Sequence, residues 1–238
     1  MLKLATKFAP RRAAFETAYQ AGFRYAEFWL NDEWLAHSDE IVDVARYYPM
    51  RYVPHFPNKG PLADESLEQA AALYRSLDCH TMVIHQTVFD PYGPRLCEID
   101  PSVRLAVENP ELTPAQFDEW AERYSGLTLD IEHFWLYTFN DASLDEILVR
   151  LRKFLTRFGE KLLHVHLGGC APGGEEHRPL YCSRDLAFRV FSLLADFDYQ
   201  GFIVAEPEIV YQTAPELRMD ALLFEAWRAQ HEGRSTTD

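Results

Sequence analysis

Eight short apolar runs, alternating with longer segments of helical spacing, constrain the fold of this chain more than any other feature. The runs are rich in β-branched and aromatic residues, which favours strands, and the segments between them carry apolar residues at three- and four-residue steps. The runs cover residues 2–9, 25–30, 51–56, 81–86, 103–109, 127–133, 162–168 and 201–208. Repeated strand–helix units favour a parallel sheet, and eight strands predict a closed (β/α)8 TIM barrel.

One α/β domain over residues 1–231 accounts for this pattern, and residues 232–238 are expected to form a flexible tail. Most of the connections between runs have the spacing of helices. The connection after the fourth run differs, because Pro91, Pro94 and the glycine between them interrupt helical spacing. We therefore predict that the fourth crossover helix is reduced to a loop.

The charge balance limits the partners that the chain can bind. Lysine and arginine number 23 against 37 aspartate and glutamate, a formal net charge of −14, so the molecule repels a polyanion such as duplex DNA. No apolar run reaches the ~18 residues that cross a bilayer, and the first residues lack the apolar core of a signal peptide. We therefore expect a cytoplasmic protein with a small-molecule substrate, without a membrane or nucleic-acid partner.

Ionisable side chains stand at or near the ends of seven of the eight runs. They are Glu27, His55, His85, Glu108, Asp130 with His133, His166 and Glu206. In a (β/α)8 barrel all strands end at one face, so these side chains are expected to converge although they are distant in sequence. Several carboxylates within a few ångströms of one another do not all stay ionised without a cation. The pattern therefore predicts a divalent metal site at this face.

The acids at three of these endings are the strongest candidates for metal ligands. Glu108 and Glu206 directly follow apolar strand residues, where an acid must be paired or solvated at the rim. Asp130 and His133 are three residues apart at a strand end, so the chain can curl and bring both toward one centre.

Histidines at the strand ends are weaker evidence when taken one by one. His55 or His85 alone is more often a packing or hydrogen-bonding residue than a metal ligand. His164 and His166 alternate along one run, so both point to the same side of the strand. We expect His166, which is nearer the open rim, to be a ligand and His164 to lie deeper in the barrel.

The loop after the seventh run, GGCAPGGEEHRPLY, is a second region where function is expected. An extra metal ligand or a contact to a substrate anion is expected from Glu175, His177 and Arg178. The alternative is a solvated turn, which glycines and charged residues also suit. Aromatic side chains crowd the same face, where they either cap the barrel or stack on a sugar. The candidate substrate contacts are Glu27, Trp29, Trp135 and Arg178.

The order of these strand endings resembles the xylose isomerase-like TIM barrels. That superfamily joins sugar isomerases and epimerases to the endonuclease-IV-type apurinic-site nucleases, AP endonuclease family 2. The resemblance spans nearly the whole chain, from GFRYAEFWL to the eighth run. It rests on Glu108 in the motif VEN, the pair Asp130-x-x-His133, His166 in HVHL, and Glu206 in the last run.

The epimerase branch of the superfamily implies one metal ion and proton transfer. In tagatose-epimerase-like members, the residues matching Glu108, Asp130, His166 and Glu206 hold one divalent ion, and the two glutamates also move the proton. The resemblance therefore implies an isomerase or epimerase of a small sugar, sugar phosphate or keto-acid that reacts through an enediolate. His133 would steady the negative charge or orient the substrate. Manganese, magnesium, cobalt, iron and zinc all suit these ligands.

The nuclease branch implies more ions and a different reaction. Its members add histidines from the third and fourth strands and an Asp-x-His pair from the loop after the seventh. His55, His85 and Glu175-x-His177 are similar to those additions, with glutamate in place of aspartate. A multi-metal phosphoesterase is therefore the alternative function, and a barrel that binds a metal or sugar without catalysis is a third. Barrels of this kind often pair, so a homodimer is also expected.

Overall fold

Eight parallel strands form a closed barrel in the computed structural model, which describes residues 1–140, 142–170 and 175–235. The strands follow one another around the barrel in chain order, and β8 pairs with β1 to close it. They are β1 (Lys3–Phe8), β2 (Tyr25–Trp29), β3 (Arg51–His55), β4 (Met82–His85), β5 (Leu105–Glu108), β6 (Leu127–Asp130), β7 (Leu162–Leu167) and β8 (Phe202–Ala205). The predicted (β/α)8 barrel is confirmed, with one strand inside each predicted run.

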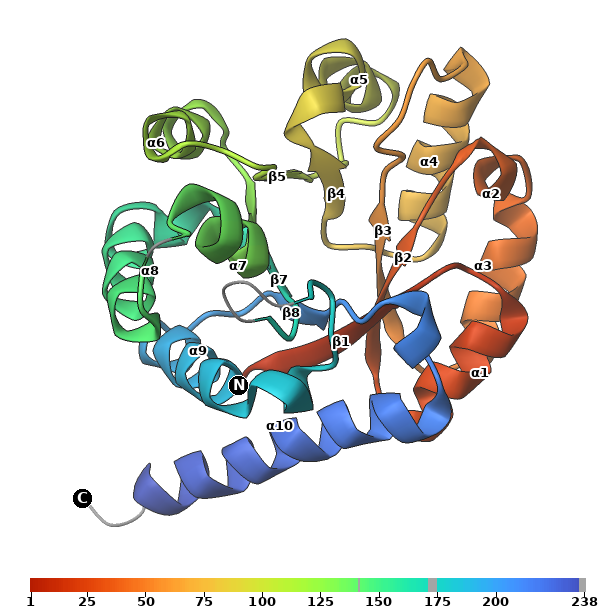
Figure 1. Ribbon diagram of the computed structural model, residues 1–238. Coiled ribbons are helices and arrows are strands. Elements are labelled where there is room, and N and C mark those ends of the chain that lie inside the picture. Colours follow the sequence, from red (N-terminus) through yellow and green to blue (C-terminus); the bar gives the residue numbers. More distant parts are fainter. Residues whose placement is uncertain (141, 171–174, 236–238) are drawn as a thin grey trace.

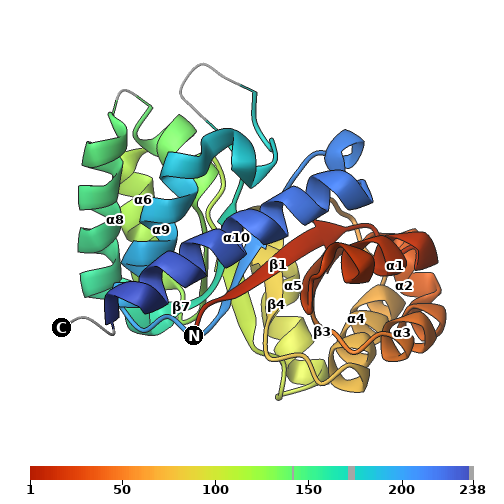
Figure 2. The same cartoon turned by 90° about the horizontal axis from the view of Figure 1, so that it is seen from below.

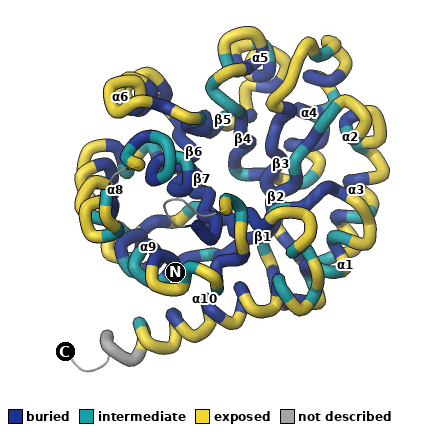
Figure 3. The backbone as a smooth tube through the Cα atoms, viewed as in Figure 1, coloured by how far each residue is buried: buried dark blue, intermediate teal, exposed yellow. Residues whose placement is uncertain are grey.

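Helices surround the barrel (Figure 1). They are α1 (Arg12–Ala21), α2 (Asp32–Ala36), α3 (Ser38–Tyr47), α4 (Asp64–Ser76), α5 (Gln86–Ile99), α6 (Pro114–Arg123), α7 (Ile131–His133), α8 (Leu144–Phe158), α9 (Arg184–Asp196) and α10 (Ala214–Ser235), with the short turns η1 (Phe134–Thr138), η2 (Gly159–Lys161), η3 (Leu180–Ser183) and η4 (Ile209–Tyr211). The strands are buried, and the helices expose their outer faces to solvent (Figure 3). Helix α10 crosses the outside of the barrel and packs against α1 and α9 (Figure 2).

The main hydrophobic core lies between the strands and the helices. Each long helix turns one apolar stripe toward the sheet, as expected for amphipathic helices that cover a barrel. Phe15 of α1, Leu67 of α4, Trp120 of α6 and Phe191 of α9 are almost completely buried in this layer. Burial of each such side chain stabilises the fold by about 1.5–3 kcal/mol. This layer makes the barrel a firm support for the residues at its rim.

The fourth crossover is the helix α5, so the prediction of a loop there is wrong. Val88, Tyr92 and Leu96 recur every four residues and are buried, which gives the segment one apolar helical face. Pro91 and Pro94 lack the backbone N–H that donates in a helix, which disfavours helix formation. Both prolines nevertheless lie inside α5. Packing of the apolar face against the barrel outweighs the local preference of proline and glycine.

Helix α10 extends to Ser235, so residues 232–235 of the predicted tail belong to this helix. The rest of that predicted tail, residues 236–238, lies outside the described residues. Neither α10 nor any other described helix is both long enough and apolar enough to cross a membrane.

Candidate metal centre

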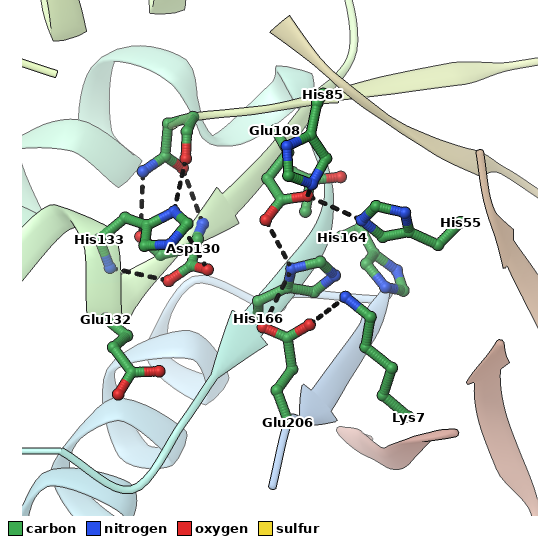
Figure 4. Close-up of polar contacts among 12 residues, drawn as sticks. Lys7, His55, His85, Glu108, Asp130, Glu132, His133, His164, His166 and Glu206 are labelled. Carbon is green, nitrogen blue, oxygen red and sulfur yellow. Dashed lines mark hydrogen bonds and ion pairs between the residues drawn. The ribbon is translucent and has the colours of Figure 1, made fainter. Parts of the chain in front are cut away.

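Side chains that point into the barrel alternate along each strand with side chains that point outward. Near the amino ends of the strands the inward residues are apolar, and Ala5, Val53, Val83 and Val204 form one buried cluster with Phe202. Ionisable residues stand two positions later on the same strands or directly after them. They are Lys7, His55, His85 and Glu206. The alternation therefore gathers these groups at the carboxyl ends of the strands, one inward position beyond the apolar cluster. Figure 4 shows these ionisable side chains together.

His166 of β7 lies at the middle of this cluster. Its Nε2 is 2.9 Å from Glu27 Oε2, and its Nδ1 is 3.2 Å from Glu108 Oε1 and 3.3 Å from Glu206 Oε2. Ionised carboxylates accept but do not donate, so each contact needs a proton or a cation. Burial disfavours a charged His166, but Glu206, Glu27 and Glu108 raise its pKa well above the usual value. A cation facing Nδ1 would satisfy the same carboxylates without that proton.

Asp130 of β6 supplies a buried oxygen that forms no hydrogen bond with the described residues. Its Oδ1 accepts a hydrogen bond from the backbone N–H of His133 at 2.9 Å, while Oδ2 has no hydrogen-bond partner among the described residues. Burial raises the pKa of Asp130 to about 6, helped by Glu206 and Glu108 and opposed by His133. Ligand atoms of Glu108, Asp130 and His166 all lie within 4.8 Å of one another. A buried oxygen without a hydrogen bond, beside possible ligand atoms of Glu108 and His166, fits a divalent cation.

A second group of possible ligands adjoins the first. His55 Nδ1 faces the backbone carbonyl of Phe56 at 3.0 Å, so that nitrogen carries the proton. His55 Nε2 and His85 Nε2 then approach Glu108 Oε2 at 3.0 and 3.1 Å. Burial, assisted by Lys7, lowers the pKa of His55, and a cation between Nε2 and this carboxylate would satisfy both. Glu108 thus presents Oε1 to His166 and Oε2 to this second group.

Lys7 belongs to the site and was not predicted from the sequence. Its Nζ contacts Glu206 and lies 3.0 Å from Glu27 Oε1, and the acids outweigh burial in raising the pKa of Lys7. The lysine therefore stays cationic and neutralises part of the acid cluster. Its signal was available in the sequence, because Lys7 follows the inward Ala5 by two positions in the first run.

Glu27 is completely buried and does not line the cavity, so its expected contact with substrate is not supported. Its Oε2 accepts hydrogen bonds from His164 Nε2 at 2.7 Å and from His166 Nε2 at 2.9 Å. His164 precedes His166 by one inward position on β7 and is itself completely buried. Burial lowers the pKa of His164, although its hydrogen bond to Glu27 opposes this. Glu27 therefore supports the site from below.

His133 faces the cavity beside Asp130. Its Nδ1 is 3.0 Å from the carbonyl oxygen of Asn109 and 3.4 Å from Asp130 Oδ2. Burial lowers the pKa of His133, but Asp130 raises it, and the net shift is upward. The buried Asn109, which the sequence did not single out, also accepts the backbone N–H of Asp130 at 2.7 Å and donates to its carbonyl at 3.1 Å. Asn109 thereby joins the ends of β5 and β6.

Five predicted contact residues near the strand ends separate into two groups. Trp29 and His177 line the cavity, together with the ligand candidates. Trp135, in contrast, is buried in η1 and donates its indole N–H to the carbonyl of Ala142 at 2.9 Å. Arg178 and Glu175 are exposed, and neither lines the cavity. The expectations of a substrate contact at Trp135 or Arg178 and of a metal ligand at Glu175 are therefore not supported.

A cavity of about 360 Å³ opens above the ligand candidates. Glu108, Asp130, His133, His177 and Glu206 all line it. Its size falls in the range of small-molecule sites. A larger groove of about 870 Å³ lies between α8 and α9 and contains none of these residues. The ionisable side chains at the strand ends line the smaller cavity and not the larger groove, so the smaller cavity is the candidate site.

The fold and the site together define the class of protein: a (β/α)8 barrel whose strand ends bring carboxylates and imidazoles around a small-molecule cavity. No family model and no curated protein matches the sequence. Solved structures do match it, and the likeness shows that this chain shares its (β/α)8 fold with sugar 3-epimerases.

Three of these structures show the extent of the likeness. A D-tagatose 3-epimerase-like protein has 15% sequence identity and a TM-score of 0.69, over 98% of this chain and 100% of that one. D-allulose 3-epimerase from Methylomonas sp., in complex with D-allulose, has 16% identity and a TM-score of 0.61, over 94% of this chain and 90% of that one. L-ribulose 3-epimerase has 15% identity and a TM-score of 0.58, over 99% and 98%.

Proposed function

We propose that this protein is a metal-dependent isomerase or epimerase of a small sugar, sugar phosphate or keto-acid. The observation that carries the proposal is the placement of Glu108, at the end of β5, and Glu206, directly after β8. Their oxygens Oε1 and Oε2 lie 3.2 and 3.3 Å from His166 Nδ1 at a small cavity. Two carboxylates at one cavity suit a reaction in which one removes a proton and the other returns one. The shared fold with sugar 3-epimerases supports the same reaction class.

Glu108, Asp130, His166 and Glu206 would hold the divalent ion. When bound, the ion would polarise the substrate carbonyl and make the neighbouring C–H more acidic. One of the two glutamates takes the proton from that carbon, and the other acid returns a proton to it. Return on the opposite face epimerises the carbon, whereas delivery to the former carbonyl carbon isomerises the sugar.

Other residues of the cavity hold charge in place during this transfer. Lys7 keeps one oxygen of Glu206 engaged, so that carboxylate is fixed in orientation. His133, held by Asn109 and Asp130, faces the cavity and is placed to hydrogen-bond a substrate oxygen that gains negative charge. Trp29 lines the cavity wall and offers a face to the C–H groups of a sugar.

A second candidate function is hydrolysis of a phosphoester with two ions. The group formed by His55, His85 and Glu108 favours it, because Glu108 could then bridge two cations. The net charge of −14 disfavours duplex DNA as the substrate. Ion number separates the two functions, since one ion per chain favours the epimerase and two or more favour the hydrolase.

Proton exchange with solvent tests the proposal. Protein loaded with manganese, cobalt or magnesium is incubated in D₂O with a panel of ketoses and ketose phosphates, and NMR follows deuterium at the carbon next to the carbonyl. We expect exchange in wild type and a loss of about 10²–10⁴-fold in Glu206→Gln. Glu160→Gln, an exposed change on η2, serves as the matched control.

Two results would contradict the epimerase. Phosphoester cleavage without exchange, together with two ions per chain, would favour the hydrolase. Neither exchange nor cleavage in wild type, with sugar binding retained, would favour a binding protein without catalysis.

A further inference from the structure

A buried carboxylate that does not line the cavity has no part in the proposed proton transfer. Glu132 of α7 is only 1% exposed. Its Oε1 accepts a hydrogen bond from the backbone N–H of His177 at 2.9 Å, and its Oε2 lies 3.1 Å from His177 Nδ1. Among the described residues, His177 is the only ion-pair partner of this acid. Burying an acid is costly without such pairing, so the contact to both groups of His177 accounts for its burial.

The chain makes room for this acid at the end of β7. A Cβ atom at Gly168 would lie 2.2 Å from Glu132 Oε2, closer than any side chain permits. Glycine at 168 is therefore required for Glu132 to reach His177. The close approach of Glu132 therefore explains the glycine at 168, independently of backbone flexibility in a turn.

His177 is fixed by its backbone as well as by its ring. It adopts φ of +52°, and its carbonyl accepts the backbone N–H of Glu208 at 2.7 Å. The next residue, Arg178, exchanges two backbone hydrogen bonds with Gly169, at 2.7 and 3.2 Å. Such a strained backbone persists only where the surroundings hold it, and it is frequent at functional sites. The imidazole is thus anchored beside the end of β7.

The anchored ring borders two adjoining cavities. It lines the cavity above the candidate ligands, and also a neighbouring cavity of about 270 Å³. Lys7, Trp29 and Glu206 line both cavities as well. The described residues give no hydrogen bond to His177 Nε2, and His177 belongs to none of the described groups with metal-ligand spacing. The ring therefore has Nδ1 in an ion-pair contact with Glu132 at 3.1 Å, while Nε2 is available to a molecule in the cavity.

We propose that His177 contacts the substrate through Nε2 and that Glu132 is the positioning residue that orients it. In this arrangement Nδ1 carries a proton toward Glu132, and Nε2 donates a hydrogen bond to a substrate oxygen above Glu206 and Asp130. Carboxylate–imidazole pairs of this kind fix the ring and its protonation in other sites. The identity of the reaction rests on the proposed function, whereas the contact itself requires only that an oxygen-rich molecule occupies the cavity.

The first test observes the ring directly. Histidine ¹⁵N NMR of the metal-loaded protein, with His177 assigned by difference from His177→Gln, is expected to show Nδ1 protonated. In Glu132→Gln the amide oxygen keeps the backbone contact and the amide N–H turns to the ring, so Nδ1 is expected to lose its proton. D-allulose added to wild type is expected to shift the Nε2 signal.

The second test uses kinetics on any ketose that exchanges. His177→Gln is expected to lower kcat by about 10²-fold and Glu132→Gln by about tenfold, with smaller changes in KM and no change in bound metal. Exposed His37→Gln and Glu160→Gln are the matched controls. If His177 only holds the loop in place, sugar will not shift the Nε2 signal and kcat will not change. If His177→Gln loses bound metal, His177 is a metal ligand. Either result overturns the proposal.

The outcomes keep the two proposals separate. Exchange in wild type with unaltered kinetics in both variants would retain the epimerase and reject the role of His177. A shift of Nε2 by D-allulose without exchange or cleavage would reject the enzyme and retain the contact.

Discussion

At the scale of single residues, the site depends on which nitrogen of each imidazole carries the proton. Glu27 Oε2 accepts a hydrogen bond from the Nε2–H of His166, which leaves Nδ1 to face Glu108 and Glu206. The carbonyl of Phe56 does the same for Nδ1 of His55. Buried acceptors behind an imidazole direct its lone pair toward a metal in many sites. The residues behind the ligands are therefore as informative as the ligands.

Replacing Glu27 by glutamine tests this support. We expect Glu27→Gln to weaken manganese binding by about 10–100-fold, because the amide no longer holds the Nε2 proton of His166 with a full charge. Competition with a fluorescent chelator measures the affinity, circular dichroism checks folding, and Glu160→Gln is the control. An affinity equal to that of wild type in folded Glu27→Gln would show that Glu27 does not support the centre.

The sequence identified the candidate ligands because each of them ends a strand, and strand ends are visible as the last residues of apolar runs. It did not identify residues whose importance comes from a contact across the fold. Glu132 follows Asp130 in the sequence, but its partner His177 is 45 positions away. Glu27 was assigned to the substrate because its strand end was visible while its depth was not.

At the scale of elements, the strands were easier to predict than one of the helices. A run of apolar residues that ends in an acid marks both the length and the end of a strand. In α5, the prolines and a glycine concealed the stripe formed by Val88, Tyr92 and Leu96. The stripe decides the structure only because a barrel surface is present to cover it, and local propensity does not contain that information.

A buried acid joins α10 to η3 and makes stability depend on pH. Asp220 of α10 accepts the backbone N–H of Tyr181 at 3.1 Å, while its other oxygen has no hydrogen-bond partner among the described residues. Burial raises the pKa of Asp220 to about 7, partly opposed by the N–H groups of Tyr181 and Leu180. Because the folded pKa exceeds the unfolded value near ~3.9, the unfolded state ionises first, and stability falls as pH rises from about 4 to about 7.

Asp220→Asn is expected to remove this loss. Asparagine keeps the acceptor for Tyr181 and carries no charge, so the variant should exceed wild type by about 2–4 kcal/mol near pH 8 and by little near pH 4. Urea unfolding across this pH range gives the difference, and Asp185→Asn, an exposed change on α9, is the control. A difference that stays constant with pH would show that Asp220 titrates alike in both states.

At the scale of the whole molecule, the negative net charge and the size of the cavity both favour a small-molecule substrate. A net charge of −14 repels polyanions, and the cavity of about 360 Å³ suits a small molecule. The number of ions is the property that the fold leaves open, because Glu108 can serve one group of ligands or two. The expected homodimer stays a prediction.

The most direct measurement is an anomalous difference map from crystals of the protein grown with manganese. We expect a peak within bonding distance of Glu108, Asp130, His166 and Glu206, at the carboxyl ends of the strands. A map without a peak at these residues, from protein that was saturated with manganese, would contradict the central claim that they form a metal centre.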